Sequence, residues 1–248
     1  TSPAPFDKIL PRGNCDFTNA AILQEENILV QDGNLNLIAK HEPKRYTGQV
    51  AAPEGQDLGC NLIGGAPFDF EQAFTSASIF SKRGYNHGFF ECRAKIPCAE
   101  GLYPVLWMWH HDELVVFEFF GDPKKHFVSA HNKEKYVTKQ FSITDYCTDF
   151  HTYAVSWTKD SITWYLDEIP LWTICRKEDS TQTDCTSSAL PDNDEYSIQE
   201  SFLDSTDRWL SPNFSLRIYE WANRVDVSQL PDTLIVDYLR IYQDQPTD

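Results

Sequence analysis

Short runs of alternating apolar and polar residues, separated by turn-forming residues, occupy most of this 248-residue chain. Successive side chains of a strand point to opposite faces, so each run predicts a strand with one buried face. The sequence shows no amphipathic helical stretch longer than about two turns that could cover such strands. Many strands without helices must bury sheet against sheet, which predicts an all-β, two-sheet antiparallel β-sandwich. The clearest runs are residues 35–39, 77–81, 88–96, 152–157, 161–166 and 234–242, and residues 158–160 and 167–168 are expected to form hairpin turns.

The length fits one large domain, because all-β sandwiches often contain roughly 200–250 residues. We expect residues 1–14 to be an N-terminal linker or edge segment and residues 15–248 to be a single domain. The first five residues, Thr-Ser-Pro-Ala-Pro, are typical of a linker that remains after a leader is removed. We therefore expect a secreted or extracellular protein. The cell surface and the periplasm are the alternative locations.

The charge balance argues against two classes of partner. The chain carries 21 Lys and Arg residues against 37 Asp and Glu residues, for a net charge of −16. Nucleic acids and anionic membranes both require a concentrated cationic face, so neither is expected as a partner. No apolar stretch approaches the roughly 18 residues needed to cross a bilayer.

Seven cysteines occur without any Cys-x-x-Cys pair, which gives little support to a zinc site or a redox motif. The odd number leaves at least one free thiol if the chain is a monomer, as we expect. Cys175 and Cys185 flank a polar segment and predict a loop-closing disulfide, in keeping with an oxidising compartment. Cys92 lies in an alternating apolar run and predicts a buried free thiol.

The most informative feature is Glu118, which stands in the middle of an apolar run. A buried ionised carboxylate is unfavourable unless it faces water or a partner. In a regular strand Glu113 and Glu118 would point to opposite faces, but one β-bulge between them would bring both to the same face. Two carboxyl groups so placed approach the separation of about 5–5.5 Å that retaining glycosidases use. The alternative is a pair of glutamates on a solvated strand face.

Residues 113–118 read Glu-Leu-Val-Val-Phe-Glu. This resembles the signature of glycoside hydrolase family 16, the clan of laminarinases, lichenases, agarases and carrageenases: Glu, aliphatic, Asp, aliphatic, an optional bulge residue, Glu. Residues 74–82, 88–97, 101–108, 150–157 and 236–242 are similar to strands of the family in the same order, so the resemblance covers about residues 15–243.

The resemblance implies a β-jelly roll of the concanavalin A type with a concave substrate cleft. It also implies that Glu113 is the nucleophile and Glu118 the general acid/base of a retaining endo-glycosidase. The substrate would be a β-linked polysaccharide or oligosaccharide, a β-glucan or a galactan. No cofactor is expected for catalysis.

Val115 departs from the family pattern, because it stands where the family has the central Asp. Valine can neither donate nor accept a hydrogen bond, and the loss of an orienting group can slow catalysis by orders of magnitude. A catalytically impaired glycan-binding protein on the same fold is therefore the alternative function. Retention of both glutamates favours the enzyme. Residues 215–221 also differ from the family's Asn-Leu-Ala-Val-Gly-Gly stretch, which leaves the substrate subgroup open.

Several aromatic and polar residues are candidates for contacting the sugar, with core packing or an outer sheet face as the alternatives. Trp107 and Trp109 share the parity of Glu113 along the chain. The resemblance further implies a structural Ca²⁺ on the convex side, near Gly33 and Asp237. The full set of substrate-binding candidates is Tyr103, Trp107, Trp109, His131, Arg217, Tyr219 and Trp221.

Overall fold

The computed structural model describes residues 6–8, 20–49, 67–110, 112–132, 136–143, 146–175, 209–219 and 224–243. Strands make up nearly all of the regular structure in these ranges, which confirms the all-β prediction. The strands are β1 (Phe6–Lys8), β2 (Ala21–Leu23), β3 (Ile28–Gln31), β4 (Asn34–Gln49), β5 (Pro67–Ser81), β6 (Gly88–Lys95), β7 (Leu102–Trp109), β8 (Glu113–Glu118), β9 (Lys125–His131), β10 (Tyr136–Ser142), β11 (His151–Trp157), β12 (Ser161–Leu166), β13 (Ile169–Cys175), β14 (Ser211–Ile218) and β15 (Asp232–Tyr242). Two short 3₁₀ turns, η2 (Glu25–Asn27) and η3 (Val227–Gln229), complete the described elements.

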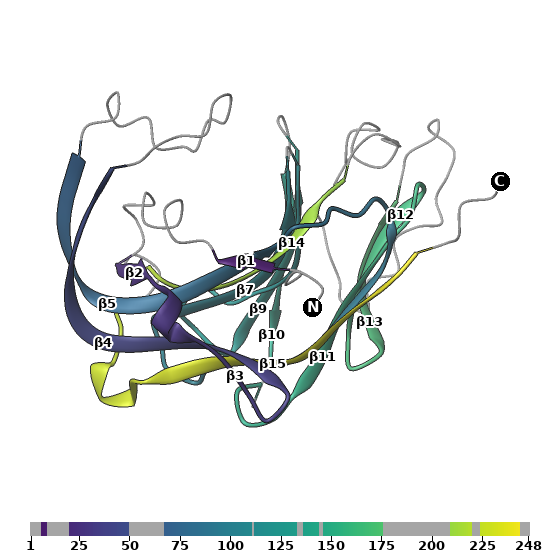
Figure 1. Ribbon diagram of the computed structural model, residues 1–248. Helices are drawn as coiled ribbons and strands as arrows, with labels where there is room; N and C mark the ends of the chain where they lie inside the picture. The colour runs from purple at the N-terminus through teal and green to yellow at the C-terminus, as the bar shows by residue number, and fades with distance from the viewer. Residues whose placement is uncertain are drawn as a thin grey trace.

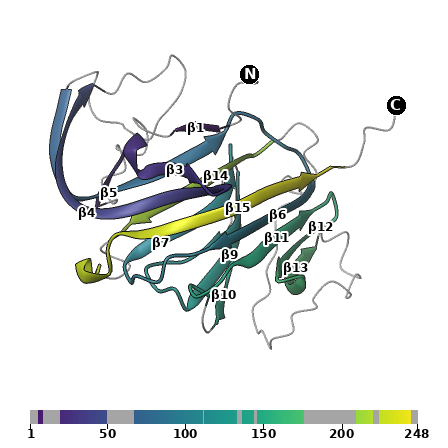
Figure 2. The same cartoon turned by 60° about the horizontal axis from the view of Figure 1, so that its bottom comes forward.

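The strands form one strongly curled sheet whose two halves pack as layers. The hydrogen-bonded order is β10-β9-β8-β7-β14-β5-β4-β15-β6-β11-β12-β13. The long strand β5 pairs first with β4 and then with β14, so it joins the two layers. Figure 1 shows β14, β7, β9 and β10 in one layer and β15, β11 and β13 in the other, and Figure 2 shows the same layers from below. The pairings are antiparallel except that of β2 with β5. This arrangement confirms the predicted two-layer jelly roll.

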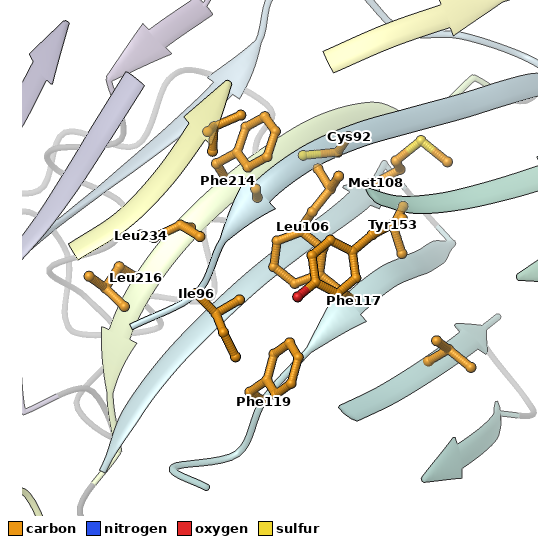
Figure 3. Packing of buried hydrophobic residues seen from close by; sticks show 14 of the residues in the cluster. Cys92, Ile96, Leu106, Met108, Phe117, Phe119, Tyr153, Phe214, Leu216 and Leu234 are labelled. Carbon is orange, nitrogen blue, oxygen red and sulfur yellow. The ribbon is translucent and has the colours of Figure 1, made fainter. Parts of the chain in front are cut away.

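The hydrophobic core lies between the two layers. The ring centroids of Phe117 in β8 and Tyr153 in β11 are 4.5 Å apart across it. Figure 3 shows these two rings beside Leu106, with Cys92 and Met108 nearby. Cys92 is fully buried and free, as its alternating run predicts. The core therefore fixes which face of each strand remains available outside it.

Both predicted hairpin turns are present. The Thr158 hydroxyl accepts hydrogen bonds from the amides of Asp160 and Ser161 and closes the turn between β11 and β12. Between β12 and β13, Asp167 and Glu168 have φ values of 47° and 68°. Two consecutive positive φ angles are the geometry of the turn that suits the twist of a two-residue hairpin.

The disulfides were only partly predictable. Cys98 and Cys147 form a disulfide across a sequence separation of 49 residues, which no local pattern indicates. Cys175 is also disulfide-bonded, but Cys185, its predicted partner, lies outside the described residues.

The N-terminal segment contributes one strand at the sheet edge. Phe6–Lys8 pairs with the end of β5, and the rest of residues 1–14 lies outside the described ranges. Within the described part of the chain, no helix has the length and apolar character needed to cross a membrane.

Candidate active site

A β-bulge interrupts β8 between the two glutamates. On β7, Trp107 lies opposite Val115 and the next residue, Leu106, lies opposite Phe117, so Val116 is an extra residue. The pairing of β8 with β9 shifts over the same stretch. The bulge predicted from the sequence is therefore present.

The bulge brings Glu113 and Glu118 to the same face of the layer. Glu113 lies opposite Trp109 and Glu118 opposite Val105, two β7 residues of the same parity. Residues paired across strands share a face, and this face is turned away from the core that receives Phe117. We call it the glutamate face. Its residues include Ser211, Asn213, Ser215 and Arg217 of β14, Tyr103, Val105, Trp107 and Trp109 of β7, Glu113, Val115 and Glu118 of β8, Phe127, Ser129 and His131 of β9, and Tyr136, Thr138 and Gln140 of β10.

A side chain from the opposite layer holds the bulge. The indole Nε1 of Trp164, in β12, donates a hydrogen bond of 2.7 Å to the carbonyl oxygen of Val115. Trp164 is completely buried and stacks on Trp172 of β13, with ring centroids 5.0 Å apart. A bulge disrupts the backbone ladder, and buried backbone groups require other partners. Trp164 supplies that partner at the residue that precedes the extra one.

Glu118 lies in an environment that favours its protonated form. Its side chain is buried, and burial raises its pKa from 4.5 to about 8. The hydroxyl of Tyr103 donates a hydrogen bond to Oε1 of Glu118. Tyr103 is itself held edge-on against Tyr219, with ring centroids 4.9 Å apart. Glu118 can therefore carry a proton at neutral pH, as a general acid must.

Glu113 is only partly buried, and a cation lies near it. Burial raises its pKa to about 7, and the positive charge of Arg217 acts in the opposite direction. The Nη1 of Arg217 donates a hydrogen bond of 2.8 Å to the Tyr219 hydroxyl. The guanidinium carbon lies 6.0 Å from the ring centroid of Trp107. Glu113 therefore ionises before Glu118 as the pH rises.

The structure places most of the other sequence-predicted site residues on the glutamate face. Trp107 and Trp109 are neighbours on β7, with ring centroids 6.2 Å apart. His131 lies directly opposite Glu113 on β9, and its Nε2 is 3.1 Å from the Ser129 hydroxyl. Trp221 lies outside the described residues.

The residues predicted to hold Ca²⁺ lie near each other in the sheet, and one of them forms an ion pair. Gly33 lies in the turn between β3 and β4, and the pairing of β15 with β4 ends at Val236, next to Asp237. The Asp237 carboxylate forms an ion pair of 2.7 Å with Arg93. The described residues contain no group of three or more His, Cys, Asp or Glu side chains that could hold a metal. A guanidinium thus lies at one oxygen of the only side-chain carboxylate among the two predicted residues. The Ca²⁺ site remains a prediction.

Two exposed aromatic residues were not predicted from the sequence as site candidates. Tyr136 begins β10 and lies on the glutamate face beside His131. Trp209 precedes β14 and packs against His110, with ring centroids 4.1 Å apart. The alternation of residues 136–142 could have indicated the face of Tyr136, because Val137 and Phe141 mark the buried parity.

Comparison with known families gives a match over most of the chain. The profile of Glycosyl hydrolases family 16 matches residues 18–222. The chain belongs to this family.

The relatives of this family 16 protein include glucanases. The chain is 27% identical over 250 aligned positions to Glucan endo-1,3-beta-glucosidase A1 of Niallia circulans. The alignment covers 92% of this chain but only 32% of the relative. A Beta-glucanase of Rhodothermus marinus is 24% identical, with 92% of this chain and 73% of the relative covered. The chain thus spans about a third of the length of the Niallia relative. Among solved structures, the laminarinase from Rhodothermus marinus has a TM-score of 0.70 at 21% identity, covering 98% of this chain and 92% of that one, which shows the shared fold.

The contact between Trp164 and the bulge predicts a specific loss of stability. Trp164→Phe leaves the buried carbonyl of Val115 without its donor, so we expect the free energy of unfolding in urea to fall by about 1–3 kcal/mol. Trp172→Phe makes the same ring change in the stacked neighbour and gives the scale of a change in the ring stack. A loss below about 1 kcal/mol in Trp164→Phe would contradict a contribution of the hydrogen bond.

The raised pKa of Glu113 predicts that this side chain destabilises the fold at alkaline pH. The folded state holds this proton more tightly than the unfolded chain, so stability falls as the pH rises from about 4.5 through 7. Glu113→Gln removes the buried charge, and we expect it to stabilise the protein at pH 8 by up to about 3 kcal/mol. The difference should vanish at pH 4. Thermal unfolding at both pH values measures it, and a variant that is less stable than the wild type at pH 8 would contradict the prediction.

Proposed function

We propose that this protein is a retaining endo-glycosidase that hydrolyses a β-glucan, with Glu113 as nucleophile and Glu118 as general acid/base. The observation that carries the proposal is the bulge at Val116, which brings a partly buried and a buried carboxyl group to one face with unequal environments. A retaining mechanism needs one ionised and one protonated carboxyl group in the same site. The glucan substrate is inferred from relatives named glucan endo-1,3-beta-glucosidase and beta-glucanase.

The first step follows from the unequal environments. The carboxylate of Glu113 attacks the anomeric carbon and forms a glycosyl ester, while Glu118 transfers its proton to the leaving glycosidic oxygen. Arg217 favours the ionised form of Glu113. Burial keeps the proton on Glu118, and the Tyr103 hydroxyl then stabilises the carboxylate that remains after transfer.

The second step reverses the first. The carboxylate of Glu118 takes a proton from a water molecule, the resulting hydroxyl attacks the anomeric carbon, and the ester bond to Glu113 breaks. Both residues return to their starting protonation states, so no cofactor enters the cycle. The sugar leaves with the configuration that the substrate had.

We further propose that the protein acts outside the cell and as a monomer. A polymeric glucan is met there, and the disulfide between Cys98 and Cys147 suits an oxidising compartment.

Val115 supports the second candidate function, a glycan-binding protein with little catalysis. Its side chain is 1% exposed and lies on the glutamate face between the two glutamates. It cannot pass a proton or orient a carboxylate. The hydrogen bond from Tyr103 to Glu118 and the positive charge of Arg217, which lowers the pKa of Glu113, favour the enzyme, because they supply polar control of both groups from β7 and β14.

Activity and its pH dependence test the proposal together. We expect release of reducing ends from a β-1,3-glucan, and Glu113→Gln should lower kcat at least about 10³-fold. Because Glu113 must be ionised and Glu118 protonated, kcat/KM should rise as the pH passes about 7 and fall above about 8.

The control is Glu26→Gln, which changes an exposed carboxylate in η2 and should leave activity unchanged. The panel should include β-1,3/1,4-glucan, agar and carrageenan. Binding without turnover on every polymer would contradict the enzyme and support the binding protein. Activity on agar or carrageenan alone would contradict the glucan assignment.

A further inference from the structure

Tyr136 exposes a large aromatic ring on the face that carries the glutamates. Its side chain is 69% exposed, whereas the next residue, Val137, points into the core. A single exposed aromatic residue is ordinary on a protein surface. Whether the Tyr136 ring can bind a ligand therefore depends on the contacts that support it and on the residues beside it.

A chain of contacts holds the ring of Tyr136 in one orientation. It stacks on His131, with ring centroids 5.7 Å apart and planes at 22°. His131 is fixed in turn by its contact of 3.1 Å with the Ser129 hydroxyl. Burial lowers the pKa of His131, so the imidazole is neutral at neutral pH and adds no charge. A ring that is already ordered loses little conformational entropy when a ligand binds to it.

The strand register places this ring in line with Glu113. Ser211, Trp109, Glu113, His131 and Tyr136 face one another in turn across β14, β7, β8, β9 and β10. Neighbouring strands lie about 4.8 Å apart, so Tyr136 is about 10 Å from Glu113 along this row. Trp109 lies one strand away on the other side. Aromatic rings therefore flank Glu113 in both directions across the strands.

We infer that Tyr136, supported by His131, is a sugar-binding platform that holds a glucosyl unit of the glucan away from the bond being cleaved. The apolar C–H face of a β-linked glucose can lie on the phenol ring, and the Tyr136 hydroxyl remains free to meet a sugar hydroxyl. This inference rests on the proposed function. Together with Trp109, the platform binds the chain on both sides of Glu113, which favours cleavage within a polymer rather than at its end.

Binding to an inactive variant tests the platform directly. On the Glu113→Gln background, calorimetry with a β-1,3-linked glucose hexasaccharide should show about 3- to 10-fold weaker binding for Tyr136→Ala. Tyr136→Phe should retain most of the affinity, because it keeps the ring. Tyr242→Ala is the matched control, since it removes an exposed tyrosine from the opposite layer.

A second measurement separates this inference from the proposed function. With Glu113 and Glu118 intact, Tyr136→Ala should shift the cleavage positions in a hexasaccharide labelled at its reducing end. If the wild type cleaves but Tyr136→Ala matches it in affinity and in cleavage positions, the platform is wrong and the proposed function stands. If Tyr242→Ala causes the same loss, the effect is general and the platform is also wrong. If the wild type neither binds nor cleaves the hexasaccharide but hydrolyses β-1,3/1,4-glucan, the platform is wrong and the proposed function stands. If it hydrolyses neither, both proposals fail.

Discussion

The geometry of the site depends on the hydrogen bond from the Trp164 indole to the carbonyl of Val115. Regular pleating would place Glu113 and Glu118 on opposite faces, and one of them would enter the core. The extra residue, Val116, changes the parity of the strand, and Trp164 satisfies a carbonyl at the point where the ladder is interrupted. A residue of one layer thus stabilises the backbone that presents two carboxyl groups on the outer face of the other.

Burial dominates the electrostatics of the two glutamates, and their neighbours set the difference between them. Desolvation raises the pKa of both side chains well above 4.5. The charge of Arg217 offsets part of this rise at Glu113. Glu118 accepts a hydrogen bond from the Tyr103 hydroxyl. Val115 lies between the two glutamates and can neither donate nor accept a hydrogen bond, so we attribute control of the protonation states to β14 and β7. The stability that these two desolvated carboxyl groups remove from the fold at neutral pH is consistent with a site selected for function.

The sequence predicted the features that depend on local alternation. The strands that contain the alternating runs, the buried thiol of Cys92 and the bulge in β8 follow from residue parity along one strand. Both hairpin turns follow from the short polar segments between such runs. The disulfide between Cys98 and Cys147 and the contact of Trp164 with Val115 could not be predicted, because they join segments distant in the chain. Tyr136 was missed because its position relative to Glu113 depends on register across three strands.

The most direct test of the central claim, that Glu113 and Glu118 have distinct roles on one face, is chemical rescue by azide. The substrate is an aryl β-glycoside of a β-1,3-linked glucose disaccharide, whose leaving group needs no acid. Glu118→Ala should give the β-glycosyl azide, because azide attacks the ester on Glu113, and Glu113→Ala should give the α-glycosyl azide by direct displacement. Proton NMR of the anomeric centre distinguishes the two products. The same anomer from both variants, or no rescue of either, would contradict the assignment.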